Sequence, residues 1–322
     1  MFSLTRSVAP LASLVVLSLA AMAFLSWYEP TAVWMLWINW AVTALMAFVV
    51  QDTLLRYYIT RIKNGVTFLI AWIVLLATAN FATLYVADDS AQWFVLLSEA
   101  GLLALLRLLL ATWEEKYAVA AYFSVGWIIG ALSTWQPYVL GWLLLLPVAL
   151  YVLRTFSVRN VWSVPTGVLL GVWVVYCVTF ALGGEAMADA MIGGYARLLS
   201  AHVPEWPLLT WQEWIFVGLL LFLLLLYAST SFLFTFEKSI RSRAGIVLLS
   251  VLSFVFLLLS AANLDCMGLS LGLLSVFVGM LLPVSLSSVR SVLNDWWIFI
   301  VLVLFQLSSL LPAVMQLLQG AS

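Results

Sequence analysis

The chain alternates long apolar runs with short polar connections. A run of about 20 apolar residues can cross a hydrocarbon core of about 30 Å as an α-helix. The sequence contains eleven such runs, at residues 8–26, 32–50, 65–86, 92–111, 118–134, 137–153, 164–182, 212–233, 245–261, 267–285 and 296–316. They are continuous rather than alternating, which favours helices over the strands of a membrane barrel. We therefore predict an all-α, polytopic transmembrane bundle that forms a single domain over residues 1–322.

The first run also has features of a secretory signal. Arg6 precedes it, and Ala21-Met22-Ala23 has the A-x-A form of a cleavage site. Because the run continues to Leu25 and is nearly long enough to span, we favour an uncleaved signal-anchor over residues 1–26. Cleavage is the alternative.

Basic residues predict the orientation of the spans. With the N-terminus in the cytoplasm, nearly every Lys and Arg lies in an inner loop or at the inner end of a span, and only Arg197 lies outside. This is the distribution that the positive-inside rule requires. We therefore predict a multi-pass protein of a bacterial inner (cytoplasmic) membrane.

The longest outer connection, residues 183–213, has an amphipathic pattern. Its apolar side carries Met187, Met191, Tyr195, Leu198 and His202, and its polar side carries Glu185, Asp189 and Arg197. This spacing predicts a helix that lies in the outer membrane interface. Most of the 17 tryptophans are interpreted as anchors at the membrane interfaces.

Composition limits the chemistry. The chain is 66% hydrophobic and 8% charged, against about 25% charged in soluble domains. A net charge of −1 and the lack of nucleotide-binding motifs argue against nucleic-acid or nucleotide partners. Cys177 and Cys266 are interpreted as apolar thiols, with one disulfide as the alternative, and the single histidine, His202, excludes multi-histidine metal sites. We expect no cofactor, except that the outer face could hold a divalent cation.

That outer face is acidic. Its carboxylates are Glu29, Asp88, Asp89, Glu185, Asp189, Glu205, Glu213 and Asp265. They form either a solvated rim, which we favour, or an acidic mouth that binds a divalent cation or a basic substrate.

Glu99 and Arg107 interrupt the fourth run. Arg107 lies near the cytoplasmic end, where its long side chain can reach water. Glu99 lies about 10 Å below the outer surface and cannot. Asn39 and Asn80 share its depth, so we predict a buried polar layer of Asn39, Asn80 and a protonated Glu99. The layer is either hydrogen-bonded packing between helices or the floor of an outward-facing cavity.

Residues 96–175 carry a resemblance to a known family. The motifs are "LLALLRL", "EEKYAVAAYF", "GALSTWQPYVLGWLLLL" and "RNVWSVPTGVLLGVW". Together they resemble an uncharacterised family of polytopic inner-membrane proteins of the Bacteroidota, from which no activity can be transferred. More distantly, the architecture looks like that of membrane glycosyltransferases and polymerases that use polyprenyl-linked sugars. That likeness implies catalytic carboxylates at Asp88, Asp89 or Glu29, and a diphosphate held by Arg197 and His202; the first outer loop is shorter than in those enzymes.

Three functions remain open from the sequence. The first is assembly of an envelope glycan from a lipid-linked sugar at the outer face. The second is a non-catalytic membrane subunit of an envelope complex, and the third is a transporter or flippase. Whether the chain is an enzyme stays open.

Overall fold

The computed structural model describes residues 8–28, 33–57, 59, 66–82, 92–199, 211–233, 239–262, 267–288 and 292–320. Over these residues no strand occurs and every regular element is a helix, which confirms the all-α prediction. The helices are α1 (Val8–Tyr28), α2 (Val33–Arg56), α3 (Val66–Phe81), α4 (Gln92–Ala111), α5 (Val119–Ser133), the 3₁₀-helix η3 (Pro137–Leu144), α6 (Leu145–Val152), α7 (Val158–Leu199), α8 (Trp211–Leu233), α9 (Ile240–Ala262), α10 (Met267–Ser288) and α11 (Val292–Gly320).

Each predicted run coincides with a helix or, at residues 137–153, with η3 followed by α6. Four segments are long and apolar enough to cross a membrane: Val33–Arg56, Trp93–Ala111, Val158–Glu185 and Ile240–Leu258. Shorter apolar stretches of 10–17 residues occur in the other helices, among them Ser13–Tyr28 of α1 and Phe299–Met315 of α11. The chain is therefore a helical membrane protein, whereas the number of crossings and their sidedness stay predictions.

Contacts between the helices divide the chain into two compact units. Unit 1 contains residues 1–99 and 206–322, and unit 2 contains residues 100–205, so that the boundary lies within α4. The prediction of one transmembrane domain is not tested by this division.

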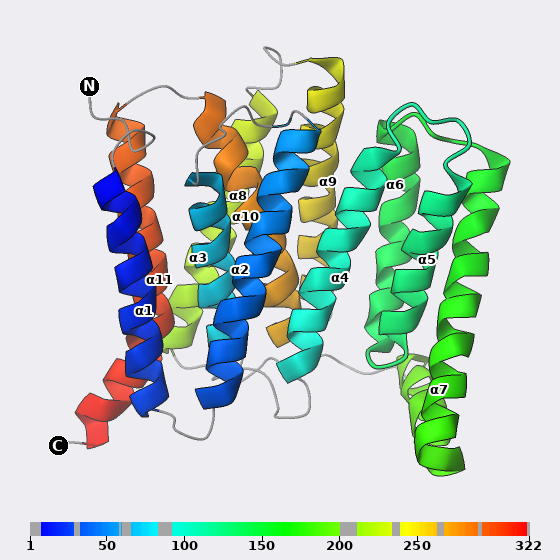
Figure 1. The fold of residues 1–322 in the computed structure, drawn as a ribbon, viewed down its shortest axis with the longest axis horizontal. Coiled ribbons are helices and arrows are strands. Elements are labelled where there is room, and N and C mark those ends of the chain that lie inside the picture. Colours follow the sequence, from blue (N-terminus) through cyan, green and yellow to red (C-terminus); the bar gives the residue numbers. More distant parts are fainter. Residues whose placement is uncertain are drawn as a thin grey trace. The chain divides into compact units, whose positions relative to one another are not determined.

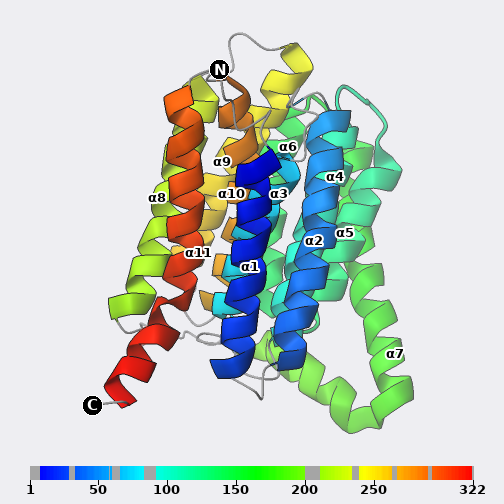
Figure 2. The same cartoon turned by 60° about the vertical axis from the view of Figure 1, so that its left-hand side comes forward.

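Two helices, α3 and α10, form the centre of unit 1 (Figures 1 and 2). Every residue from 69 to 82 and from 271 to 284 is buried. A helix that is apolar on all sides is typical of a core surrounded by other helices. α3 packs against α2, α10 and α11, and α10 also packs against α8 and α9.

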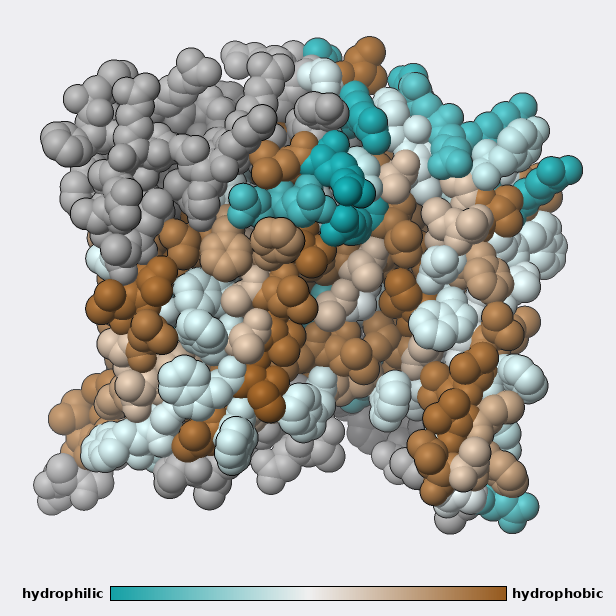
Figure 3. Space-filling model, in the orientation of Figure 1, coloured by the Kyte–Doolittle hydropathy of each residue, from teal (hydrophilic) through white to brown (hydrophobic). Residues whose placement is uncertain are grey.

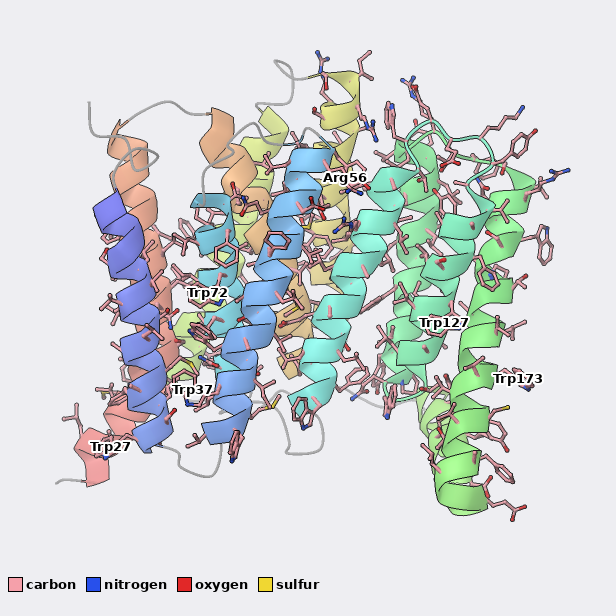
Figure 4. All side chains as sticks on the ribbon, viewed as in Figure 1. Trp27, Trp37, Arg56, Trp72, Trp127 and Trp173 are labelled. Atoms are coloured by element: carbon pink, nitrogen blue, oxygen red, sulfur yellow. The ribbon has the colours of Figure 1, made fainter. Side chains whose placement is uncertain are left out.

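In α1 and α2, exposed tryptophan side chains lie near one end, and a basic side chain of α2 lies at the other. Trp27 and Trp37 are exposed near one end of α1 and α2, and Arg56 lies at the opposite end of α2 (Figure 4). Figure 3 shows hydrophilic side chains gathered near the Arg56 end. Trp72 differs from the expected interface anchors, because it is buried and its Nε1 donates to the carbonyl of Trp40 at 3.3 Å.

An arginine and a tyrosine of unit 1 that are distant in sequence are in contact. The guanidinium of Arg241, at the start of α9, lies 5.5 Å from the centre of the Tyr57 ring, just after α2. In addition, α1 and α11 pack together and run in the same direction (Figure 1), as an odd number of spans requires. The threading of the chain through the membrane stays a prediction.

In unit 2, α5 and α7 pack backbone to backbone through four glycines. Gly126 and Gly130 lie on α5, and Gly167 and Gly171 lie on α7. A Cβ added at any of the four would come within 3.0 Å of a backbone atom of the other helix. Small residues spaced four apart allow such close approach in membranes, where it increases van der Waals contact between helices.

The other helices of unit 2 are irregular. Pro137 opens η3, where its fixed φ suits a first helical turn. Near its end α7 turns back on itself (Figures 1 and 2). The turn is at Gly184, whose φ of 69° and ψ of −167° are accessible only to glycine. The helix after the turn, residues 185–199, occupies part of the predicted amphipathic connection.

We predict that Gly130→Ala destabilises the protein. The new Cβ would collide with the backbone of Val168, and overpacking of this kind costs about 1–3 kcal/mol. Gly218→Ala on α8 is the matched control, because no atom lies within 4 Å of a Cβ there. Alanine is the better helix former, so the control should be neutral or stabilising. Thermal unfolding in detergent measures both, and equal melting temperatures would contradict the packing.

Candidate functional site

Two of the predicted layer residues form a hydrogen-bonded pair in unit 1. The Nδ2 of Asn39, on α2, donates to the Oδ1 of Asn80, on α3, at 3.2 Å. The Nδ2 of Asn80 in turn donates to the Sδ of Met22, on α1, at 3.2 Å. Both amides are buried. This chain of bonds ties three helices together inside an apolar core, as the packing interpretation of the layer expects.

The third layer residue, Glu99, is in a different environment. Its side chain is fully buried, and in the described part of the chain neither carboxyl oxygen has a hydrogen-bond partner. The expected bond between this carboxyl and an amide of the layer is therefore not formed. Burying a carboxyl without a partner costs several kcal/mol more in its charged than in its neutral form, so only a protonated Glu99 suits this position.

A glycine of α10 accommodates the Glu99 carboxyl. A Cβ at Gly272 would come within 3.0 Å of Glu99 Oε1 and of Val95 Cγ1. The carboxyl therefore packs directly against the α10 backbone at Gly272, whose carbonyl accepts a hydrogen bond from the buried Ser275 hydroxyl at 2.6 Å. No wider side chain fits at position 272 while the carboxyl stays where it is.

Two polar residues near this core were not predicted from the sequence. Gln306, on α11, is 1% exposed, and neither of its amide atoms has a hydrogen-bond partner among the described residues. The hydroxyl of Ser98, beside Glu99, is likewise buried without a partner. Gln306 carried the same sequence signal as Glu99, a polar residue within an apolar run. Gly272 carried no signal, because a small residue in such a run is ordinary.

The candidates of the outer face are mostly outside the described residues. Glu29, Asp88, Asp89 and His202 lie there, and for Arg197 only the backbone is described. Glu185 and Asp189 are exposed on α7, after its turn. No group of three His, Cys, Asp or Glu side chains within the described ranges could hold a metal ion. The outer divalent cation stays a prediction.

The turned part of α7 is attached to α5. The hydroxyls of Tyr195 and Ser133 are hydrogen-bonded at 2.9 Å, and Ser133 also donates to the carbonyl of Gly130 at 2.8 Å. Burial raises the pKa of Tyr195 above its ordinary value of 10.0. Its phenol is therefore protonated at neutral pH and can donate. The cysteine on the same helix, Cys177, is an exposed free thiol, whereas Cys266 lies outside the described residues.

No protein-family model, curated protein or solved structure matches the chain.

Gly272→Ala tests the enclosure of Glu99. The added methyl should displace the carboxyl and Val95, and so lower the free energy of unfolding. Glu99→Ala should remove most of that penalty, giving a double-mutant coupling energy of about 0.5–3 kcal/mol, the range for side chains in contact.

The matched control is Gly279→Ala on the same helix, where a Cβ would meet Ala71 at an ordinary 3.5 Å. It should show no coupling with Glu99→Ala. Denaturation of the four combinations in detergent gives the energies, and additive effects of the changes at positions 272 and 99 would contradict the contact.

Tyr195→Phe should loosen the turned part of α7. A hydrogen bond contributes about 1 kcal/mol, so amide hydrogen exchange over residues 185–199 should rise about fivefold. Tyr176→Phe is the control, because Tyr176 lies on α7 and its ring stacks on Phe180. Similar exchange in all three proteins would show that the bond does not hold this segment.

Proposed function

We propose that the chain is a proton-dependent transporter or flippase of the bacterial inner membrane, in which Glu99 takes up and releases the proton. Its substrate would be a polar or lipid-linked precursor of the cell envelope, the class suggested by the likeness to enzymes of polyprenyl-linked sugars. The observation that carries the proposal is the fully buried Glu99 carboxyl without a hydrogen-bond partner.

The burial of Glu99 favours this function over a structural role. Ionisable residues inside membrane helices are costly and typically belong to proton or substrate pathways. A carboxyl that only joined helices would be expected to bind a donor, as Asn80 does with Asn39. Because no described donor contacts Glu99, its carboxyl adds no hydrogen bond between the described helices in the enclosed state.

The surroundings of Glu99 provide a means of exposing it. Its carboxyl is covered by the backbone of α10 at Gly272. α10 contains Pro283, and proline removes a backbone hydrogen bond from a helix and weakens it locally. A shift of α10 away from α4 would admit water to the carboxyl and allow the proton to leave. Transporters commonly use irregular helices next to their binding sites.

Glu99→Gln is expected to fold normally and to abolish activity, because the amide has the shape of the protonated acid but cannot release a proton. Activity is measured by complementation of a deletion strain, scored by growth under envelope stress across external pH. Glu99→Asp should keep partial activity, and Glu185→Gln, at an exposed carboxylate, should keep full activity. Full complementation by Glu99→Gln at every pH would rule out the proposed role.

A lipid-linked glycan enzyme is the second candidate. The exposed carboxylates of Glu185 and Asp189 favour it, because they lie beyond the α7 turn on the segment that carries Arg197. In this case Asp88→Asn with Asp89→Asn should abolish activity, Glu99→Gln should be tolerated, and the deletion should change the lipid-linked oligosaccharide pool. A subunit of an envelope complex, the remaining alternative, would instead lose a co-purifying partner.

A further inference from the structure

Two turns of unit 2 are joined into one surface. The first turn, residues 112–118, connects α4 to α5, and the second, residues 153–157, connects α6 to α7. The backbone N–H of Glu114 donates to the carbonyl of Leu153 at 3.1 Å. The buried Asn160 donates to the carbonyls of Thr155, at 2.6 Å, and Lys116, at 3.4 Å. These bonds fix the two turns with respect to each other.

Both turns contain backbone strain. Glu114 and Arg154 each have a φ of 57°, and they are the non-glycine residues with positive φ in the described part of the chain. Arg154 directly follows the C-cap of α6, a position that glycine usually occupies, and a positive φ at a residue with a side chain costs about 1–2 kcal/mol. Such strain is concentrated at functional sites. Turn formation alone therefore does not explain why Glu114 and Arg154, rather than glycines, occupy these positions.

Basic side chains lie on and next to the two strained turns. Lys116 Nζ and Arg159 Cζ lie 5.6 Å and 5.5 Å from the centre of the Tyr117 ring, so that both charges are held beside one aromatic side chain. Arg154 Nη1 lies 3.7 Å from Glu114 Oε1, in a pair whose side chains are 68% and 54% exposed. Three basic residues and the carboxylates Glu114 and Glu115 leave this surface with a net charge of +1. The N-terminus of α7, capped by Ser157, adds to the positive potential.

Exposed aromatic residues surround these cations. Tyr117, Tyr151, Phe156 and Trp162 are between 58% and 84% exposed and lie at or next to the ends of apolar helices. Aromatic side chains at such positions lie at the level of the lipid headgroups. The anion that is abundant at this level is the phosphate of a phospholipid, and basic groups between helix ends are typical of anionic lipid recognition.

We propose that the paired turns at residues 112–118 and 153–157, together with Arg159, bind the phosphate of an anionic phospholipid headgroup. Arg154 and Arg159 donate to the phosphate oxygens, and Lys116 contributes charge. The exposed aromatic side chains contact the glycerol and upper acyl region. This last contact favours a lipid over free phosphate, which has no apolar part. The site is independent of Glu99 and of the proposed transport.

The test compares two double variants with equal loss of charge. Arg154→Gln with Arg159→Gln removes the guanidinium groups of the site, and Arg241→Gln with Arg243→Gln removes two exposed ones at the start of α9 in unit 1. Binding of phosphatidylglycerol and of phosphatidylcholine to the purified full-length protein is titrated by native mass spectrometry in detergent. Circular dichroism establishes that both variants are folded.

Wild type should bind phosphatidylglycerol more tightly than phosphatidylcholine. The site variant should bind it about 30-fold more weakly, which corresponds to about 2 kcal/mol, and the control should be unchanged. Equal losses in the two variants would show only non-specific attraction and overturn the proposal. The proposal would also be overturned if inorganic phosphate at equal concentration competed with phosphatidylglycerol, because the site would then bind a soluble anion.

Arg154→Gly supplies a second, independent measurement. Glycine relieves the strain of the positive φ, so this variant should melt at a higher temperature than wild type in phosphatidylcholine micelles. At the same time its binding of phosphatidylglycerol should weaken. A variant that is more stable and binds the anionic lipid as well as wild type would show that Arg154 has no part in the site.

Discussion

The structure of unit 1 depends on the absence of water around its two central helices. α3 and α10 are buried on all sides, so each polar group that they enclose must find its partner within the protein. Asn39 and Asn80 meet this requirement by bonding to each other, and Thr43 and Thr78 by bonding to backbone carbonyls of their own helices. Against this background, the Glu99 carboxyl and the Gln306 amide stand out, because the described residues offer neither of them a partner. The buried hydroxyls of Ser98 and Thr67 also lack a hydrogen-bond partner among the described residues, but a hydroxyl is less costly to enclose than a carboxyl.

Unit 2 is stabilised in another way. α5 and α7 enclose few polar groups between them and instead bring their backbones together at four glycines. Between membrane helices, close packing is a principal source of attraction, since lipid tails are as apolar as the side chains that they replace. The opposite face of α7 is exposed over much of its length, with Trp162, Leu169 and Trp173 on the outside. Its attachment to α5 therefore depends on one narrow, well-fitted stripe.

Much of this fold could be predicted from hydropathy, because the length of an apolar run and its charged boundaries are local properties. The runs at 92–111 and 212–233 match α4 and α8 to within a residue. The close contact between α5 and α7 also has a sequence pattern, since glycines lie four residues apart at 126 and 130 and at 167 and 171. This contact was not predicted from the sequence. The depth of Glu99 in the membrane is a prediction from counting along one helix, and the structure encloses its side chain completely. Its neighbour Gly272 could not be predicted, because that contact depends on how α4 and α10 meet in three dimensions.

Glu99 and Gly272 depend on each other, because the carboxyl occupies the space that a side chain at position 272 would need. Gly272 lacks a side chain, and this leaves space for a carboxyl that no described donor stabilises. If the protein needed only a filled core, an alanine at 272 and a shorter residue at 99 would pack as well and avoid the cost of enclosing an acid. In the proposed transport function, the acid is used in a second state, in which α10 has moved and water reaches the carboxyl. The enclosed form described by the structure is then one of two conformations, and the free energy stored in the enclosed acid lowers the cost of reaching the other.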